Sequence, residues 1–233
     1  MTQVTTKKTK GEQTRARILE TALRLFRERG YHETTMRIIA EEADVALGNT
    51  YYYFRSKEDL IHAFYVQLQL DQLAASEGVL LSEHTFRARL SGALRAQMAV
   101  MAPHQSLFAT LFGIAADPRN PLNPFSEETR AVRERSISQF VEIIEGADEK
   151  VPPDIAAELP TLLWLYHLAL VLFWIYDRSA GFVATYRLLE MSTEMIANLL
   201  TLTSTPLMAP FRKSILRMIE SVREASVSSG VAD

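Results

Sequence analysis

The scarcity of glycine and proline constrains this chain most, because only nine of each occur in 233 residues. These two residues supply most tight turns, so their low number disfavours architectures built from many short strands. Hydrophobic residues make up 48% of the chain and charged residues 23%, which is ordinary for a globular protein and excludes general disorder. The sequence therefore predicts an all-α protein.

Apolar residues recur at helical spacing along the whole chain, beginning with a helix that ends at a candidate cap, Gly30. Thr34 or Thr35 can cap the next helix, and Ser56 opens a capping box before a long one. The same spacing predicts helices at residues 83–102, 104–116, 126–146, 154–178, 182–203 and 207–225, and a frayed tail at 226–233. Pro160 is expected to kink or restart the helix that contains it.

Several kinds of chemistry are excluded or disfavoured by what the chain lacks. It holds no cysteine, so disulfides, thiolate metal sites and cysteine nucleophiles are excluded. Its histidines show no close paired spacing, and phosphate loops, dinucleotide fingerprints and hydrolase motifs are not found. We therefore expect no metal, no cofactor and no enzymatic activity. No apolar segment follows Lys7, Lys8 and Lys10, so we expect no secretory signal and a cytoplasmic protein.

Residues 162–176 form the most apolar stretch of the chain. The stretch is interrupted by His167 and followed at once by Asp177 and Arg178. A membrane-spanning helix needs about 20 apolar residues, and a shorter helix without a polar face belongs in a core or an interface. We expect the second outcome and no membrane partner. Membrane association through 162–176 is the alternative.

Charge is unevenly distributed along the chain. The first 30 residues carry eight basic and three acidic side chains, whereas residues 61–233 carry 14 basic and 19 acidic ones. A basic end on an acidic body is typical of a module that binds a polyanion, and a solvated tail is the alternative. The basic residues that either follow DNA as an arm or belong to such a tail are Lys7, Lys8, Lys10, Arg15 and Arg17.

Residues 34–54 predict a helix, a tight break and a second short helix, which is the layout of a helix-turn-helix. Three tyrosines, residues 51–53, follow small residues in the second helix, whose N-terminus can approach phosphate closely. Three successive helical residues span roughly 200°, so they cannot all be buried on one face. Their rings and hydroxyls suit thymine methyls and phosphate oxygens. Ordinary packing is the alternative for any single tyrosine, and Phe54 is expected to face the core.

The segment Thr14–Phe64 contains further short residue patterns at fixed spacings on both sides of this motif. They are Ile18-Leu19 with Ala22 and Leu25-Phe26, Gly30-Tyr31, Thr35-Met36-Arg37, Ile39-Ala40, Ala43-x-Val45, Gly48-x-x-Tyr51-x-Tyr53-Phe54 and Ser56-Lys57-Glu58-x-Leu60. In this order and spacing the segment resembles the DNA-binding region of the TetR family of transcriptional regulators.

The resemblance implies an all-helical homodimer that binds double-stranded DNA at a near-palindromic operator. Residues 1–55 correspond to an N-terminal arm and a three-helix helix-turn-helix domain, and residues 56–233 to a larger effector-binding and dimerisation domain. The DNA-binding positions that it assigns are Thr35, Arg37, Leu47, Gly48, Asn49, Thr50, Tyr51, Tyr52, Tyr53 and Lys57.

Four positions depart from the family's pattern. Asp44 replaces the usual glycine, and aspartate tolerates the left-handed conformation better than most residues. Ala46 replaces a Ser or Thr cap, which costs about 1 kcal/mol of capping. Leu47 stands where a polar or basic residue is common, and Ile38 replaces a frequent aspartate.

For the body, the resemblance assigns residues 154–178 and 182–203 to a four-helix interface between two copies. The side chains expected to line an effector site are Phe86, Met98, Met101, Phe108, Phe112, Trp164, His167 and Trp174. Each of them alone is more often plain core. His167 is a satisfied core histidine, a hydrogen-bonding group for a ligand, or a metal ligand.

These features predict a ligand-responsive transcriptional regulator, specifically a repressor that a small, mostly apolar effector of unknown identity releases from its operator. The alternative is an α-helical small-molecule carrier with a residual DNA-binding domain.

Overall fold

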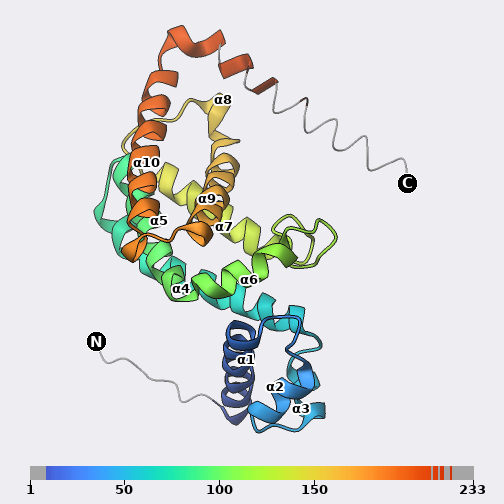
Figure 1. Ribbon diagram of the computed structural model, residues 1–233. Coiled ribbons are helices and arrows are strands. Elements are labelled where there is room, and N and C mark those ends of the chain that lie inside the picture. Colours follow the sequence, from blue (N-terminus) through green and yellow to red (C-terminus); the bar gives the residue numbers. More distant parts are fainter. Residues whose placement is uncertain (1–8, 211, 215, 218–220, 222–233) are drawn as a thin grey trace. The chain divides into compact units, whose positions relative to one another are not determined.

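The computed structural model describes residues 9–210, 212–214, 216, 217 and 221. Within these residues the regular structure is helical and contains no strand, which confirms the all-α prediction. The helices (Figure 1) are α1 Lys10–Arg29, α2 Met36–Glu42, α3 Leu47–Tyr53, α4 Lys57–Ser82, α5 Phe86–Met101, α6 Gln105–Ala115, α7 Arg130–Glu145, α8 Pro153–Ala156, α9 Leu159–Tyr176 and α10 Val183–Thr203. Short 3-10 helices occupy Ala102–His104, Ala180–Phe182 and Pro206–Met208.

The chain divides into two compact units. The first contains residues 1–72 and 100–134, and the second contains residues 73–99 and 135–233. Helices α4, α5 and α7 each have residues in both units. The functional boundary after residue 55 stays a prediction, because compactness alone does not say which residues bind DNA.

In the first unit, α1, α2 and α3 pack together at the blue end of the chain (Figure 1). Ile18 and Phe26 from α1 and Ile39 from α2 are completely buried, and Phe54 is 2% exposed. These are the apolar positions that helical spacing places on the inner faces. The expected core position of Phe54 is therefore confirmed.

The ends of these helices follow from local sequence. Gly30 caps α1 at a φ of 86°, where L side chains are strained. The Thr35 side chain caps α2 by accepting a hydrogen bond from the Ile38 amide. Asp44 adopts a φ of 50° in the tight break, as its tolerance of left-handed backbone predicts. Ala46 precedes α3 and provides no side-chain cap.

The loop between α6 and α7 is longer than the sequence predicts, because α7 begins at Arg130 and not near residue 126. The Asn123 side chain donates to the Ala115 carbonyl and accepts from the Phe125 amide. The Thr129 hydroxyl donates to the Asn123 carbonyl. These side chains bond to the loop backbone in competition with helix formation, which delays the start of α7.

In the second unit, α9 and α10 lie side by side (Figure 1). The predicted restart at Pro160 is confirmed, since α8 ends at Ala156 and α9 starts anew with Pro160 in its first turn. Asp177 ends α9 and accepts hydrogen bonds from Ser179 and Thr185, which fixes the start of α10. These bonds hold the pKa of Asp177 well below its usual value, although burial alone would raise it.

Two stretches are long and apolar enough to cross a membrane, by length and composition only: residues 86–115 and Leu159–Tyr176. Core helices of soluble proteins pass the same test, so this is weak evidence for a span. The predicted final helix 207–225 lies only partly within the described residues, of which 209, 210, 212–214, 216, 217 and 221 are helical. The predicted tail at 226–233 lies outside them.

Candidate DNA-binding surface and effector-binding residues

Helix α3 presents two large aromatic side chains to solvent. The Tyr52 side chain is 80% exposed and that of Tyr51 is 47% exposed. Tyr53 is half-buried and packs edge-on against Tyr52, with ring centroids 5.2 Å apart. The exposed face of α3 thus combines flat apolar rings with hydroxyl groups, which suits contacts with bases and phosphates.

The residues before these tyrosines leave the backbone of α3 accessible. Gly48 and Asn49 are exposed, and a Cβ atom on Gly48 would meet no protein atom within 4 Å. Neither packing nor a positive φ therefore requires glycine at position 48. A small residue there lets a partner outside the chain approach the backbone closely. Leu47 is half-buried at the start of the same helix.

Thr50 differs from the expectation. Its side chain is completely buried, and its hydroxyl donates a hydrogen bond to the Ala46 carbonyl at 3.3 Å. Threonine in a helix interior can satisfy its hydroxyl on the preceding turn in this way. Thr50 therefore supports α3 from the inside, and we correct its predicted contact with DNA.

The predicted DNA-binding positions outside α3 have different surroundings. Thr35 and Arg37 are exposed at the start of α2. Lys57 opens α4, where its Nζ donates to the Tyr31 carbonyl at 2.7 Å and lies 4.1 Å from the Tyr31 ring centroid. Burial lowers the pKa of Lys57. Its contact with DNA stays a prediction, and in this structure Lys57 anchors the segment after α1.

Tyr31 joins the same segment to α4 through a second contact. Its hydroxyl donates to the Glu58 carboxylate at 2.5 Å. Burial raises the pKa of Tyr31, and the neighbouring Glu58 raises it further. Burial is the largest single influence on Glu58 and opposes its ionisation, but the hydrogen bonds from Tyr31, Ser56 and the backbone, together with the charge of Lys57, outweigh it and lower the pKa of Glu58 overall. The three-helix module is thereby fixed to the N-terminal end of α4.

Three of the basic residues assigned to an arm or a tail belong to a helix instead. Thr9 and Glu12 form a capping box, so α1 already begins at Lys10. The Arg15 guanidinium lies 4.8 Å from the Phe54 ring centroid, and Arg17 bonds to the Asp44 carbonyl. The remaining two, Lys7 and Lys8, lie outside the described residues.

The predicted effector-binding side chains do not fall within one compact unit. Met101, Phe108 and Phe112 belong to the first unit, where Phe108 stacks against Tyr65 with centroids 6.2 Å apart. The second unit holds Phe86, Met98, Trp164, His167 and Trp174. All of this second group except His167 are buried, and His167 is half-buried.

His167 has the properties of a polar group in apolar surroundings. Its ring lies 6.2 Å from that of Phe140, and burial lowers its pKa to about 4. The imidazole is therefore neutral at pH 7. Its Nε2 atom is buried without a hydrogen-bond partner among the residues that the structure describes. No cluster of three or more metal-ligating side chains occurs in that part of the chain.

Sequence reasoning missed a buried polar pair that joins α5 to α7. Gln97 on α5 donates to Gln139 on α7 at 2.6 Å, and both side chains are at least 94% buried. Within the described residues, the Gln97 Oε1 atom has no hydrogen-bond partner. Gln139 precedes Phe140, the residue that contacts His167. The available signal was a glutamine on the apolar face of each helix, which helical spacing reveals.

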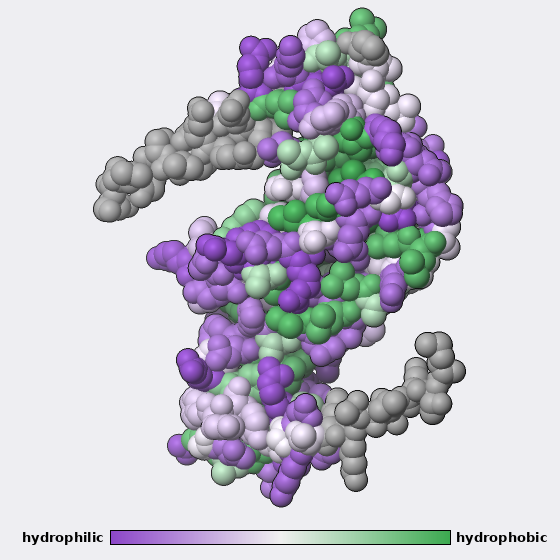
Figure 2. All heavy atoms as spheres, turned by 180° about the vertical axis from the view of Figure 1, so that it is seen from behind, coloured by the Kyte–Doolittle hydropathy of each residue, from purple (hydrophilic) through white to green (hydrophobic). Residues whose placement is uncertain are grey.

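Helices α9 and α10 expose large apolar side chains at helical spacing. Their exposed fractions range from 38% to 63%, and the residues are Leu162, Leu165, Leu172, Phe173 and Tyr176 on α9 and Leu188, Met191, Met195, Leu199 and Leu202 on α10. We call them the α9–α10 stripe. A shallow groove on α10 is lined by Met191, Glu194, Met195, Asn198, Leu199 and Leu202, none of which was predicted to bind an effector. Figure 2 shows the opposite side from Figure 1, where apolar patches alternate with hydrophilic surface.

Comparison with known proteins agrees with the geometry of the helix-turn-helix. Residues 18–64 match the family described as bacterial regulatory proteins of the tetR family, and residues 89–217 match the tetracyclin repressor-like C-terminal domain. The transcriptional regulator UidR of Escherichia coli K12 is 39% identical over 66 residues, which are 28% of this chain and 34% of that protein. The matched segment thus spans about a third of that relative. The fatty acid metabolism regulator of Bacillus subtilis is 25% identical over 129 residues, which are 55% of this chain and 63% of that protein.

Solved structures share the fold over most of the chain. A TetR transcriptional regulator from Nitrosomonas europaea aligns with a TM-score of 0.62 at 18% identity, covering 78% of this chain and 97% of that one. FadR from Bacillus subtilis, solved with stearoyl-CoA, aligns with a TM-score of 0.60 at 17% identity, covering 76% and 96%. Because the C-terminal family match alone spans more than half of the sequence, this chain belongs to the TetR family of transcriptional regulators.

Proposed function

We propose that the chain is a one-component transcriptional repressor that binds a near-palindromic operator as a homodimer and leaves it when a small, mostly apolar effector binds the body. The observation that carries this proposal is the exposed face of α3, where Tyr51 and Tyr52 project from a helix whose inner side is buried. Family membership supports the same function. The proposal includes a cytoplasmic location and no catalytic activity, cofactor or membrane partner.

The rigidity of the three-helix module supports a role for α3 in reading DNA. Thr50 and Phe54 bury the inner side of α3, and the Tyr53 hydroxyl lies beside α1 near Gly11. Tyr51 and Tyr52 are therefore held outward by a packed support. Side chains that are positioned before binding lose less conformational freedom on contact with a partner.

The second unit supports the effector-binding part of the proposal. Gln97 Oε1 and His167 Nε2 are buried polar atoms without a partner in the described part of the chain. An unsatisfied buried polar atom costs about 1–3 kcal/mol, which a ligand that hydrogen-bonds to it can recover. Trp164, Met98 and Phe86 are buried apolar residues of the same unit. This combination fits a neutral, mostly apolar molecule with one polar end.

The α9–α10 stripe supports assembly into a homodimer. Single exposed apolar residues are normal, whereas contiguous ones mark interaction surfaces. A two-fold axis would place the stripe of one copy against the same stripe of the other. Obligate interfaces of this kind bury about 2,000 Å² or more.

Selection from random duplexes tests the proposed function directly. The purified chain should enrich near-palindromic sites whose half-sites lie about one helical turn, or a multiple of it, apart. Affinity for the enriched duplex should fall steeply with salt, because phosphate contacts release counterions. The Tyr51→Ala/Tyr52→Ala double variant, shown to be folded by circular dichroism, is the matched control and should enrich no site. A wild-type chain that enriches no sequence would contradict the proposal.

A further inference from the structure

Arg89 on α5 is a buried cation whose hydrogen bonds go to backbone carbonyls. It is 6% exposed. Its Nε donates to the Ile143 carbonyl at 3.0 Å and its Nη2 to the Glu142 carbonyl at 2.9 Å. Its Nη1 donates to the carbonyls of Leu80 at 2.6 Å and Glu83 at 2.9 Å. Among the residues that the structure describes, no carboxylate forms an ion pair with Arg89. We call Arg89 and these four carbonyls the Arg89 clamp.

The clamp connects the C-terminal ends of α4 and α7 to α5. Leu80 lies in the last turn of α4, and Glu83 directly follows that helix. Glu142 and Ile143 belong to the last turn of α7. Carbonyls in the last turn of a helix mostly lack intrahelical partners, although the Glu142 carbonyl also accepts from the Gly146 amide at 3.1 Å. Each helix C-terminus carries about half a negative charge. Two such ends together offset about one positive charge, which explains how a guanidinium is buried here without a carboxylate.

The surroundings of the clamp are built to hold it in place. A Cβ atom on Gly146 would lie 2.1 Å from Nη2 of Arg89, so only glycine leaves room for the guanidinium. The Asp148 amide donates to the His84 carbonyl at 2.8 Å, which joins the segments that follow α4 and α7. The Glu149 carboxylate accepts from the Phe86 amide and fixes the start of α5. Backbone and side-chain contacts together thus fix the positions of the ends of α4 and α7 and the start of α5 relative to one another.

These three helices are the ones that have residues in both compact units. Helix α4 begins at Lys57, which is anchored to Tyr31 of the DNA-binding module. Helices α5 and α7 also carry Gln97 and Gln139, the buried pair in the proposed effector-binding part. The clamp therefore connects the helices that carry the buried pair to the helix that bears the recognition module.

We propose that Arg89 is the positioning residue of the regulatory switch. By tying α4 and α7 to α5, it keeps the three helices in the arrangement that binds DNA and makes them respond together when a ligand separates α5 from α7. This inference rests on the proposed function. Arg89 touches neither DNA nor the effector in this account, and acts only through the helix ends that it holds.

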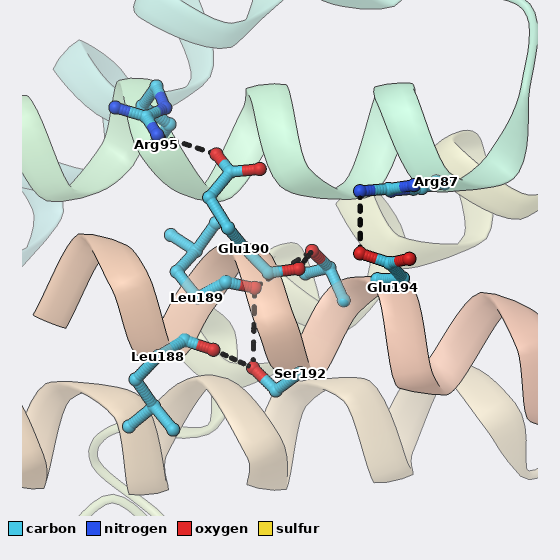
Figure 3. Close-up of polar contacts among 8 residues, drawn as sticks. Arg87, Arg95, Leu188, Leu189, Glu190, Ser192 and Glu194 are labelled. Carbon is cyan, nitrogen blue, oxygen red and sulfur yellow. Dashed lines mark hydrogen bonds and ion pairs between the residues drawn. The ribbon is translucent and has the colours of Figure 1, made fainter.

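Substitution of Arg89 tests this role, and the same helix offers matched controls. Arg87 and Arg95 form surface ion pairs with Glu194 and Glu190 of α10 (Figure 3). The N–O distances are 2.9 Å and 2.5 Å, respectively. Arg89→Met removes the clamp, whereas Arg87→Met and Arg95→Met remove an arginine from α5 and leave the clamp intact. Each variant would be measured for affinity to the duplex enriched by the wild-type chain, well below its melting temperature.

Loss of the clamp reduces the population of the DNA-binding arrangement, so Arg89→Met should lower operator affinity about tenfold or more. The two control variants should stay within about twofold of the wild type, because exposed ion pairs contribute little. Hydrogen exchange of Arg89→Met should speed up at the last turns of α4 and α7, and Arg89→Lys, which keeps the charge with fewer donors, should recover part of the operator affinity.

If Arg89→Met fails to fold, Gly146→Ala gives the same test, because its methyl group displaces the guanidinium and keeps its charge. A folded Arg89→Met or Gly146→Ala variant that binds the operator within twofold of the wild type would overturn the inference. Failure of the wild-type chain to enrich any duplex would instead overturn the proposed function, and the inference with it.

Discussion

Helix α3 and the α9–α10 stripe both expose large side chains, but of different chemistry. On α3, Tyr52 is 80% exposed and ends in a hydroxyl group. On α10, Met191 is 63% exposed and has no strong hydrogen-bonding group. A tyrosine side chain can form a hydrated contact with a charged partner, and its hydroxyl group can hydrogen-bond to water when no partner is bound. The α9–α10 stripe consists mostly of leucine and methionine side chains, which stabilise a complex only when water is excluded from them. Under the proposed function, we therefore expect a reversible partner at α3 and a permanent one at α9 and α10.

The largest expected effect follows from placing charge in the stripe. Leu188→Lys together with Met195→Lys should convert dimers into monomers or aggregates, because central interface residues contribute about 2 kcal/mol or more each. Sedimentation velocity measures the outcome. Thr201→Lys places the same charge at an exposed position of α10 off the stripe and should leave the dimer intact. An unchanged dimer in the double variant would place the interface elsewhere.

The next effect concerns the face of α3. Tyr51→Ala or Tyr52→Ala should weaken operator binding by roughly 1–3 kcal/mol each, the usual size of a base contact. Phe125, an exposed aromatic residue in the loop before α7, provides the control, and Phe125→Ala should bind normally. Titration with the selected duplex measures both. Normal affinity in a folded Tyr51→Ala/Tyr52→Ala variant would remove α3 from the interface.

A pH-dependent effect tests the buried part of the second unit. Burial lowers the pKa of His167 to about 4, whereas an unfolded chain titrates near 6.5. The unfolded state therefore binds more protons between these values, and the free energy of unfolding should fall by about 2 kcal/mol as pH drops from 6.5 to 4. Below about pH 3 the imidazole is protonated in both states, and this contribution does not change further.

Denaturant titrations across this pH range measure that slope. His167→Gln should reduce it, because the variant has no titratable group at position 167. His32→Gln, at an exposed position in the first unit, is the control and should keep the wild-type slope. An equal slope in the His167→Gln and wild-type chains would show that the imidazole is not held neutral by burial.

The smallest effect lies in the DNA-binding module itself. Thr35→Ala removes the hydrogen bond to the Ile38 amide and should cost about 1 kcal/mol of stability. Thr35→Ser keeps an accepting hydroxyl and should recover most of that loss. Thermal unfolding of the wild-type chain and the two variants measures these differences in stability. If Thr35→Ala is as stable as Thr35→Ser, the cap contributes nothing.

The three-helix module and the body that follows it also differed in how far the sequence could predict their structure. In the three-helix module, local signals sufficed: Gly30 and Thr35 mark helix ends, and the inward position of Phe54 follows from helical spacing. The family resemblance assigned Thr50 to the DNA contacts, but the side chain of Thr50 faces inward and is completely buried. On a helical wheel, the orientation that places Tyr51 and Tyr52 outward places Thr50 on the inner side of α3.

In the body, the decisive contacts join residues far apart in sequence. Arg89 meets Glu142 and Ile143 from more than fifty positions away, and no local pattern distinguishes it from Arg87 or Arg95. The partners of a buried polar group depend on tertiary packing, which periodicity does not encode. Helix positions could therefore be predicted there, and helical spacing could have placed Gln97 and Gln139 on apolar faces, whereas their pairing with each other and the partners of Arg89 could not be predicted.

The mass of the protein–DNA complex tests the central claim most directly, because it involves both exposed faces at once. Light scattering or native mass spectrometry of the purified chain with its selected duplex should give two chains per near-palindromic site. The Leu188→Lys/Met195→Lys variant should lose this stoichiometry although its α3 face is unchanged. A wild-type complex with one chain per duplex, or no complex with any selected sequence, would contradict the account.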